Sequence, residues 1–148
     1  MIKINFNGSY SAPQRQKIRR AADFFMSQLL TSRKASNTDV VISIKKSIGA
    51  EGFCSVHEDE ENNYSPKQFQ IDLESRKNIK EFLSTLAHEM VHMRQFRNQE
   101  LGYRENYTRF RGRAYKLSMP YDKQPWEKEA YKLEKVLVKK FEEYCYDI

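Results

Sequence analysis

The spacing of apolar residues along the chain predicts three helices. After Pro13, apolar side chains return every three or four positions, and a proline suits the first turn of a helix. A longer stripe follows Asn78, which together with Glu81 matches the capping-box pattern of a helix start. A third stripe begins near Pro125. The three stripes consist of Ile18, Ala21, Ala22, Phe25 and Leu29; of Ile79, Phe82, Leu83, Leu86, Met90 and Met93; and of Trp126, Ala130, Leu133, Leu137, Phe141 and Tyr144.

Four short segments outside these helices are typical of strands, because they alternate in polarity or are rich in β-branched residues. They are residues 2–6 (IKINF), 40–45 (VVISIK), 52–57 (GFCSVH) and 69–73 (FQIDL). Gly102 marks the exit from the second helix, and residues 107–116 (YTRFRGRAYK) predict a hairpin or an irregular loop around Gly112. The order of helix, small mixed sheet, helix, basic excursion and helix predicts one α+β domain over residues 1–148.

Composition narrows the class of protein. The chain has 148 residues, of which 39% are hydrophobic and 31% are charged, as expected for a globular domain with one modest core. No apolar run approaches the roughly 18 residues that a membrane span needs. The start, MIKINFNGSY, lacks the apolar core of a signal peptide. Cys54 and Cys145 lie far apart and are expected to be reduced thiols, so we expect a cytoplasmic protein, in the host cytoplasm if a phage encodes it.

The formal net charge of +6 is unevenly distributed. Residues 94–116 contain seven lysines and arginines against Glu100 and Glu105. Runs of charge are usually solvated surface, but a basic stretch can also attract nucleic acid or an acidic protein. The candidate contacts to DNA, or to a DNA-bound protein, are Arg109, Arg111 and Arg113.

Candidate chemistry comes from the stretch LAHEMVHMRQ at 86–95. His88 and His92 are four residues apart, so on a helix they project from one face, where two imidazoles can reach one zinc ion at about 2.0–2.1 Å. Glu89 then points beside the metal, where a base can take a proton from a zinc-bound water. The chain has three histidines, and two of them occupy this motif. The alternative is a pair of structural histidines beside a surface glutamate.

A catalytic zinc ion usually has three protein ligands and a water. His57 is one candidate for the third ligand, although it precedes an acidic run in which a solvated side chain is expected. PWEKEAY at 125–131 offers Glu127 and Glu129 at the start of the last helix, where the small Ala130 allows two helices to approach closely. Helical geometry alone does not choose between the two glutamates, and acidic residues are in any case favoured at a helix N-terminus.

TLAHEMVHMRQ followed by PWEKEAY resembles the small zincin metallopeptidases of phage and bacterial genomes, which are SprT-like in the broad sense. The pair of motifs is also similar to the ImmA/IrrE and HtpX groups of gluzincins, in which H-E-x-x-H is followed by a downstream E-x-x-A. The resemblance implies a minimal zincin-like domain with a glutamate-bearing C-terminal helix. It also implies that His88, His92 and Glu127 hold zinc, because Glu127 fits E-x-x-A, with Glu129 in reserve.

In these families the strand before the zinc helix forms the rim at which a peptide docks. The resemblance therefore implies that Phe69, Gln70 and Ile71 bind substrate. Two features depart from the families. No histidine follows His92, whereas SprT-type proteins usually supply a third one, and Tyr131 stands where the HtpX type often has an aspartate. The residue that orients the two histidines is thus left unassigned.

The predicted function is hydrolysis of peptide bonds in a protein or peptide substrate by a zinc-activated water, with Glu89 as general base. An oxyanion donor is also needed, and Tyr115 is the preferred candidate because it closes the RFRGRAY segment that faces the expected cleft. The other candidates are Tyr103, Tyr107 and Tyr121. The alternative function is a zinc-stapled nucleic-acid-binding or regulatory module without proteolytic activity. Glu89 discriminates between the two, because a purely structural zinc site needs no base.

Overall fold

The computed structural model describes residues 1–8, 10–60 and 65–146. Its α-helices and 3-10 helices are α1 (Ala12–Leu29), α2 (Ser32–Ser36), η1 (Glu58–Glu60), α3 (Ile79–Arg97), η2 (Tyr121–Lys123) and α4 (Pro125–Tyr146). Its strands are β1 (Ile2–Asn5), β2 (Asp39–Lys45), β3 (Gly52–Val56), β4 (Gln68–Glu74), β5 (Leu101–Tyr103), β6 (Tyr107–Phe110) and β7 (Arg113–Lys116). The predicted α+β class is confirmed. None of the described helices combines the length and the apolar character needed to cross a membrane.

The larger sheet is mixed, and its strands follow the order β1-β2-β4-β3. Strands β1, β2 and β4 are parallel, and β3 runs antiparallel to β4 at the edge. Side chains in β2 and β4 alternate between buried and partly exposed, as in a sheet with one covered face. The buried side chains on this face include Val40, Ile42, Phe69, Ile71 and Leu73.

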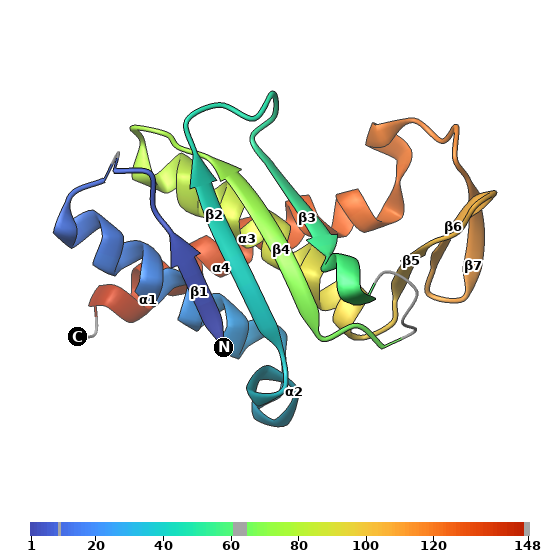
Figure 1. Cartoon of the computed structure of the whole chain (residues 1–148), viewed down its shortest axis with the longest axis horizontal. Helices are drawn as coiled ribbons and strands as arrows, with labels where there is room; N and C mark the ends of the chain where they lie inside the picture. The colour runs from blue at the N-terminus through green and yellow to red at the C-terminus, as the bar shows by residue number, and fades with distance from the viewer. Residues whose placement is uncertain (9, 61–64, 147–148) are drawn as a thin grey trace.

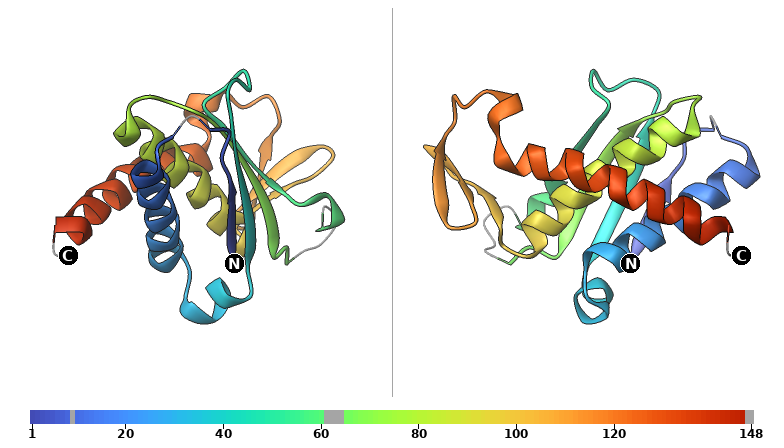
Figure 2. Two further views of the ribbon diagram at one scale, coloured as in Figure 1. Left: turned by 60° about the vertical axis from the view of Figure 1, so that its left-hand side comes forward. Right: turned by 180° about the vertical axis from the view of Figure 1, so that it is seen from behind.

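Helices α1 and α3 cover that face, and α4 packs across them on the side away from the sheet (Figures 1 and 2). Helix α3 is therefore enclosed between the sheet and α4. Twelve of its residues are buried, among them His88, Glu89, His92 and Gln95. Burial of polar groups is unfavourable unless they find partners, so these four side chains require a local network.

The predicted helix starts agree with the observed caps. Helix α1 begins at Ala12, where Ser11 and Gln14 form a reciprocal capping box ahead of the predicted start at Pro13. At the start of α3, the Asn78 side chain accepts a hydrogen bond from the backbone of Glu81 at 3.2 Å. The Glu81 carboxylate instead lies 3.8 Å from Arg76. These local bonds satisfy backbone donors that the first helical turn leaves without partners.

After α3 the chain forms a separate three-stranded antiparallel sheet, β5-β6-β7, which lies at one end of the molecule (Figure 1). Helix α3 ends through Gln99, whose φ of 61° reverses the chain direction. Gly102 lies within β5 and does not form the helix exit that its position predicted. Arg111 and Gly112 have φ angles of 49° and 79°, as in a two-residue hairpin turn of type I′. Of the two alternatives for residues 107–116, the hairpin is the observed one.

Candidate metal centre

Three potential metal ligands converge where α3 and α4 cross. His88 and His92 project from one face of α3, and Glu127 lies on the first turn of α4. Ala130, fully buried, lies one turn further along α4 in the helix interface. The candidate ligand atoms of the three residues all lie within 4.8 Å of one another. Two imidazoles and a carboxylate are a donor set that suits zinc, so the residues present fit such an ion.

A single carboxylate oxygen of Glu127 contacts both histidines. Its Oε1 lies 2.9 Å from His88 Nε2 and 3.0 Å from His92 Nε2. Glu129 turns away from the histidines and accepts hydrogen bonds from Gln95 and Arg94 at 3.1 and 3.2 Å. The structure therefore brings Glu127, and not Glu129, to the two histidines.

The His92 ring is oriented by Gln95. The Gln95 amide nitrogen donates to the Trp126 carbonyl at 3.0 Å and to Glu129, so Gln95 Oε1 is left to accept a hydrogen bond from His92 Nδ1 at 2.8 Å. This assignment directs His92 Nε2 towards Glu127. The buried His88 Nδ1 has Glu134 Oε1 at 3.5 Å, too far for a good hydrogen bond. Gln95 and Glu134 are thus the partners of the two rings.

The network holds protons where a cation would bind. Burial by itself lowers the pKa of His88, but the hydrogen bond with Glu127 and the nearby Glu134 carboxylate outweigh burial and raise that pKa to about 9. The pKa of His92 is also raised, since its bond to Glu127 outweighs the effect of burial. Burial raises the pKa of Glu127, but the bonds from the two histidines lower it to about 2. A metal ion must therefore displace protons from the histidines.

Glu89 lies beside these ligands in a different environment. Its side chain is 7% exposed, and it forms no hydrogen bond or ion pair with any other described residue. Burial raises its pKa, and the nearby histidines oppose that rise. At Gly52, the first residue of β3, an added Cβ would lie 3.1 Å from Glu89 Cγ and 2.9 Å from Leu73 Cδ2. The absence of a side chain at residue 52 thus lets β3 approach Glu89.

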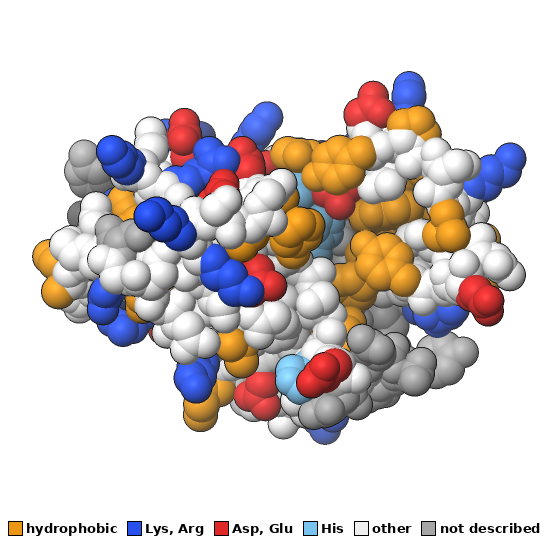
Figure 3. Space-filling model, turned by 45° about the horizontal axis from the view of Figure 1, so that its top comes forward, with side chains coloured by type: hydrophobic (Ala, Val, Ile, Leu, Met, Phe, Trp, Pro, Cys, Tyr) orange, Lys and Arg blue, Asp and Glu red, His pale blue; other side chains and the backbone are white. Residues whose placement is uncertain are grey.

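One cavity of about 440 Å³ is lined by His88, Glu89, His92 and Glu127. We call it the metal cavity. Figure 3 shows it as a hollow in which histidine and acidic side chains lie between hydrophobic ones. Phe53, Tyr103, Tyr121 and Tyr131 line it as well and are each about half exposed. The metal cavity therefore has buried polar groups at its base and accessible aromatic side chains around it.

Tyr121 reaches the site, and Tyr115 does not. The Tyr121 hydroxyl donates to Glu127 Oε1 at 2.9 Å and lies 3.1 Å from the Tyr131 hydroxyl. Burial, followed by these two contacts, raises the Tyr121 pKa, so the hydroxyl stays protonated. Tyr115 instead packs on Trp126 with ring centroids 5.6 Å apart, outside the metal cavity. The structure therefore does not bring the preferred candidate, Tyr115, to the metal cavity, because β7 turns that ring towards Trp126.

The strand predicted to form the rim of the substrate site, β4, does not border the metal cavity. Strand β4 lies between β2 and β3, so both of its edges are already paired. Phe69 and Ile71 are at most 1% exposed in the core, and the Gln70 amide donates to Ser43 and Asp72 on the other face of the sheet. The structure therefore does not bring Phe69, Gln70 and Ile71 to the metal cavity, and their contact with substrate stays a prediction. The strand that borders the metal cavity is β3.

The remaining candidates lie elsewhere. His57 follows β3 and does not line the metal cavity. Arg111 pairs with both Glu100 and Glu129, and the Arg109 guanidinium donates to the Gln99 carbonyl at 3.0 Å. Arg113 is exposed. The three arginines thus differ in their surroundings, and their binding of a polyanion stays a prediction.

Two residues of the site were missed in the sequence, although their spacing identifies them. Gln95 is a polar residue three positions after His92, within an apolar helix face. Glu134 lies seven positions after Glu127 and four after Ala130, on the same face of α4. Buried polar residues at helical spacing from the motif are the signal that predicts such orienting partners.

Comparison with protein-family models, with curated proteins and with solved structures gave no significant match for this chain. The resemblance to zincins therefore rests on the motif residues, whose donor atoms the fold gathers at one point.

Proposed function

We propose that this chain is a zinc-dependent metallopeptidase that hydrolyses polypeptides lying along β3. The observation that carries the proposal is the convergence of His88, His92 and Glu127 within 4.8 Å, at the base of a cavity that Glu89 also lines. Glu89 supports hydrolysis rather than a structural site, because it is buried without a partner among the described residues. A carboxylate in that state is poised to accept a proton.

A zinc ion held by His88, His92 and Glu127 would supply Lewis acidity and a water of lowered pKa. Glu89 takes the proton of the attacking water and passes it to the amine that leaves. Burial assists this role, since it raises the pKa of Glu89 and so favours proton uptake. The Tyr121 hydroxyl lies in the metal cavity and donates its one proton to Glu127 Oε1 in the metal-free protein; with Glu127 bound to a metal ion, it would turn to donate that hydrogen bond to the oxyanion that develops on the substrate carbonyl.

Strand β3 is the proposed binding edge for the substrate. It ends the larger sheet, and no described strand pairs with its outer side. An extended peptide can add to such an edge through main-chain hydrogen bonds. The close packing of Gly52 on Glu89 brings this edge next to the catalytic carboxylate, and Phe53 is 52% exposed beside it.

The test is the nearly isosteric Glu89→Gln substitution. We expect the variant to retain one zinc ion per chain, while hydrolysis of an unfolded protein such as casein falls by about 10²–10⁴-fold, the usual contribution of a general base. Zinc is measured by elemental analysis and hydrolysis by release of peptides, with a chelator control. Glu81→Gln, an exposed glutamate on the same helix, is the matched control. A His88→Ala/His92→Ala double variant gives the metal-free reference.

Three outcomes would contradict the proposal at different points. A parent protein that binds no zinc would reject the metal centre altogether. Full hydrolysis by the Glu89→Gln variant would remove Glu89 from the mechanism. Retained zinc that stabilises the fold, without any hydrolysis that depends on Glu89, would favour the zinc-stapled alternative.

A further inference from the structure

A second, smaller pocket opens beside the metal cavity. The two hollows share Cys54, Phe96 and Tyr103 in their walls, so they are adjacent. The smaller one, which we call the side pocket, has a volume of about 170 Å³. Sites for whole small-molecule ligands generally measure about 300–1,000 Å³. The side pocket therefore suits one side chain, or one end, of a peptide that extends from the metal cavity.

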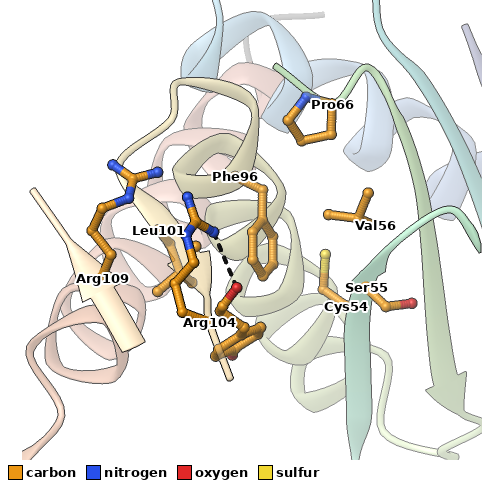
Figure 4. Close-up of a pocket in the computed structure, with 10 residues that line it drawn as sticks. Cys54, Ser55, Val56, Pro66, Phe96, Leu101, Arg104 and Arg109 are labelled. Carbon is orange, nitrogen blue, oxygen red and sulfur yellow. Dashed lines mark hydrogen bonds between the residues drawn. The ribbon is translucent and has the colours of Figure 1, made fainter. Parts of the chain in front are cut away.

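The side pocket has an apolar part and a cationic part. Phe96 and Leu101 are 5% and 3% exposed and form its interior, with Val56 from β3 beside them. In Figure 4 the guanidinium groups of Arg104 and Arg109 lie across the pocket from Val56. None of the described residues that line the pocket is acidic. A ligand with an apolar stem and a negatively charged end matches this distribution.

Both guanidinium groups are fixed by backbone contacts. Arg104 Nη1 donates to the Tyr103 carbonyl and Arg109 Nη1 to the Gln99 carbonyl, each at 3.0 Å. A guanidinium has five N–H donors, so the single bond made by Arg109 leaves other donors for a ligand. Held in this way, an arginine loses little further conformational freedom when it binds a carboxylate.

Gly102 allows the two arginines to converge. A Cβ at this position would lie 3.0 Å from Arg104 Nη1 and 3.1 Å from Arg109 Nη2. Both guanidinium groups therefore pack over the same backbone unit of β5, and a side chain there would push them aside. Two planar cations brought to one place form a site for an anion that accepts several hydrogen bonds, as a carboxylate does.

We propose that the side pocket is a subsite for a substrate carboxylate carried on an apolar stem. The carboxylate comes either from an acidic side chain near the scissile bond or from the C-terminal end of the substrate. This inference rests on the proposed peptidase function, because it assumes that a polypeptide lies across the metal cavity. It adds a substrate class, namely peptides with an acidic group one pocket away from the metal centre.

The experiment measures peptide binding to the zinc-loaded Glu89→Gln protein by fluorescence anisotropy, so that it does not depend on turnover. The first comparison uses labelled alanine peptides with blocked ends. At each position in turn, a peptide with one Glu is paired with the same peptide carrying Gln there. The second pair has a free C-terminal carboxylate or a C-terminal amide. We expect the acidic member of one pair to bind about tenfold more tightly, as charge-assisted hydrogen bonds allow.

Variants then assign the preference to the pocket. Arg104→Gln and Arg109→Gln should each reduce it, and the double variant should abolish it. Gly102→Ala keeps both charges but displaces them, so it should reduce the preference as well. Arg113→Gln removes an exposed charge from the same sheet outside the pocket and should leave the preference intact. Circular dichroism verifies folding, and if the double variant fails to fold, the single Arg104→Gln and Gly102→Ala variants decide.

The outcomes separate the possible ligands. A preference in the first pair identifies an acidic side chain, and a preference in the second identifies the chain end. The subsite would be overturned if the acidic and neutral members of both pairs bound equally or not at all. It would also be overturned by a preference that the arginine variants leave unchanged. Failure of the proposed function is seen elsewhere, as a parent protein without zinc or without hydrolysis that depends on Glu89.

Discussion

Helix α3 and the segment 101–123 border the same cavity, but they hold their polar groups in different ways. On α3, His88, Glu89 and His92 are each 7% exposed, and Gln95 fixes the His92 ring. In the other segment, Tyr121 is 53% exposed. The helix thus presents desolvated groups, of which the two histidines have partners within the protein and Glu89 has none among the described residues. The segment 101–123 presents groups that solvent, and therefore a substrate, can reach.

This difference follows from packing. Helix α3 is enclosed by the sheet and by α4, so an ionisable side chain on it must find a partner or have a pKa shifted towards its neutral form. The segment 101–123 buries fewer side chains, and its aromatic residues Tyr103 and Tyr121 are more than half exposed. A metal site needs ligands that the surrounding packing fixes, whereas groups that recognise a substrate must also be accessible to it. Substitutions in the two regions can test this difference between buried metal ligands on α3 and accessible groups in the segment 101–123.

The largest difference is expected between two neighbouring glutamates on α4. Glu127→Ala removes a proposed ligand and should lower zinc affinity by more than about 100-fold, whereas Glu129→Ala removes a partner of Gln95 and should lower it by about 10-fold. Competition with a chromogenic chelator ranks the two variants. The reverse ranking would show that Glu129 is the ligand and that the observed direction of Glu127 has another cause.

The next comparison lies within the segment 101–123. Tyr121→Phe removes a hydroxyl that points into the metal cavity, and we expect kcat to fall by about 10²–10³-fold, as after loss of an oxyanion donor. Zinc content should not change. Tyr115→Phe is the matched control, because the Tyr115 ring packs on Trp126 away from the metal cavity. Equal activity of the two variants would exclude Tyr121 as the donor.

How far the sequence predicts this site depends on how local each part is. The positions of His88, Glu89 and His92 follow from helical periodicity and from the Asn78 cap, both of which act within one segment. Glu127 requires contact between two helices, and geometry within one helix did not separate it from Glu129. The E-x-x-A resemblance made that choice, and the observed distances agree with it.

The placements that the sequence could not predict depend on contacts between distant segments. Strand β3 crosses to the outer edge of β4, so the order β1-β2-β4-β3 differs from the chain order, and nothing within 69–73 reveals this. The sequence therefore pointed to β4, whereas the strand beside the metal cavity is β3. The position of Tyr115 could not be predicted for a similar reason, because its ring packs on Trp126 of another element.

A smaller effect concerns pH and distinguishes the two forms of the protein. In the metal-free form the pKa of His88 is raised from 6.5 to about 9, so its contribution to folding stability is complete below pH 6.5 and is lost as pH rises through about 9. We expect the thermal midpoint of the metal-free protein to fall over that interval. The midpoint of the zinc-loaded protein should rise, because protons then compete less with the metal.

Variants of the two glutamates assign this effect to its source. Glu127→Gln removes the charge that raises the His88 pKa, so the fall in the metal-free midpoint should become shallower. Glu129→Gln leaves the contact between His88 and Glu127 intact and should therefore preserve the fall in the metal-free midpoint. The pKa of Glu127 is lowered to about 2, so its own contribution is lost only in acid and does not affect this interval. A metal-free midpoint that rises with pH in the parent would contradict the proposed proton network.

The smallest expected effect lies in the β6–β7 hairpin. Arg111 pairs with Glu129, which bonds to Gln95, which in turn orients His92, so the hairpin is connected to the metal site through two intermediates. Arg111 is half exposed, and exposed ion pairs contribute only about 0–1 kcal/mol. Arg111→Gln should therefore lower zinc affinity by at most about fivefold, and Arg113→Gln should not change it. Chelator competition at low and high salt measures both variants, and the effect of Arg111→Gln should shrink at high salt, where exposed ion pairs are screened. A loss as large as that of Glu129→Ala would show that the hairpin fixes the metal ligands, and the division between helix α3 and the segment 101–123 would then fail.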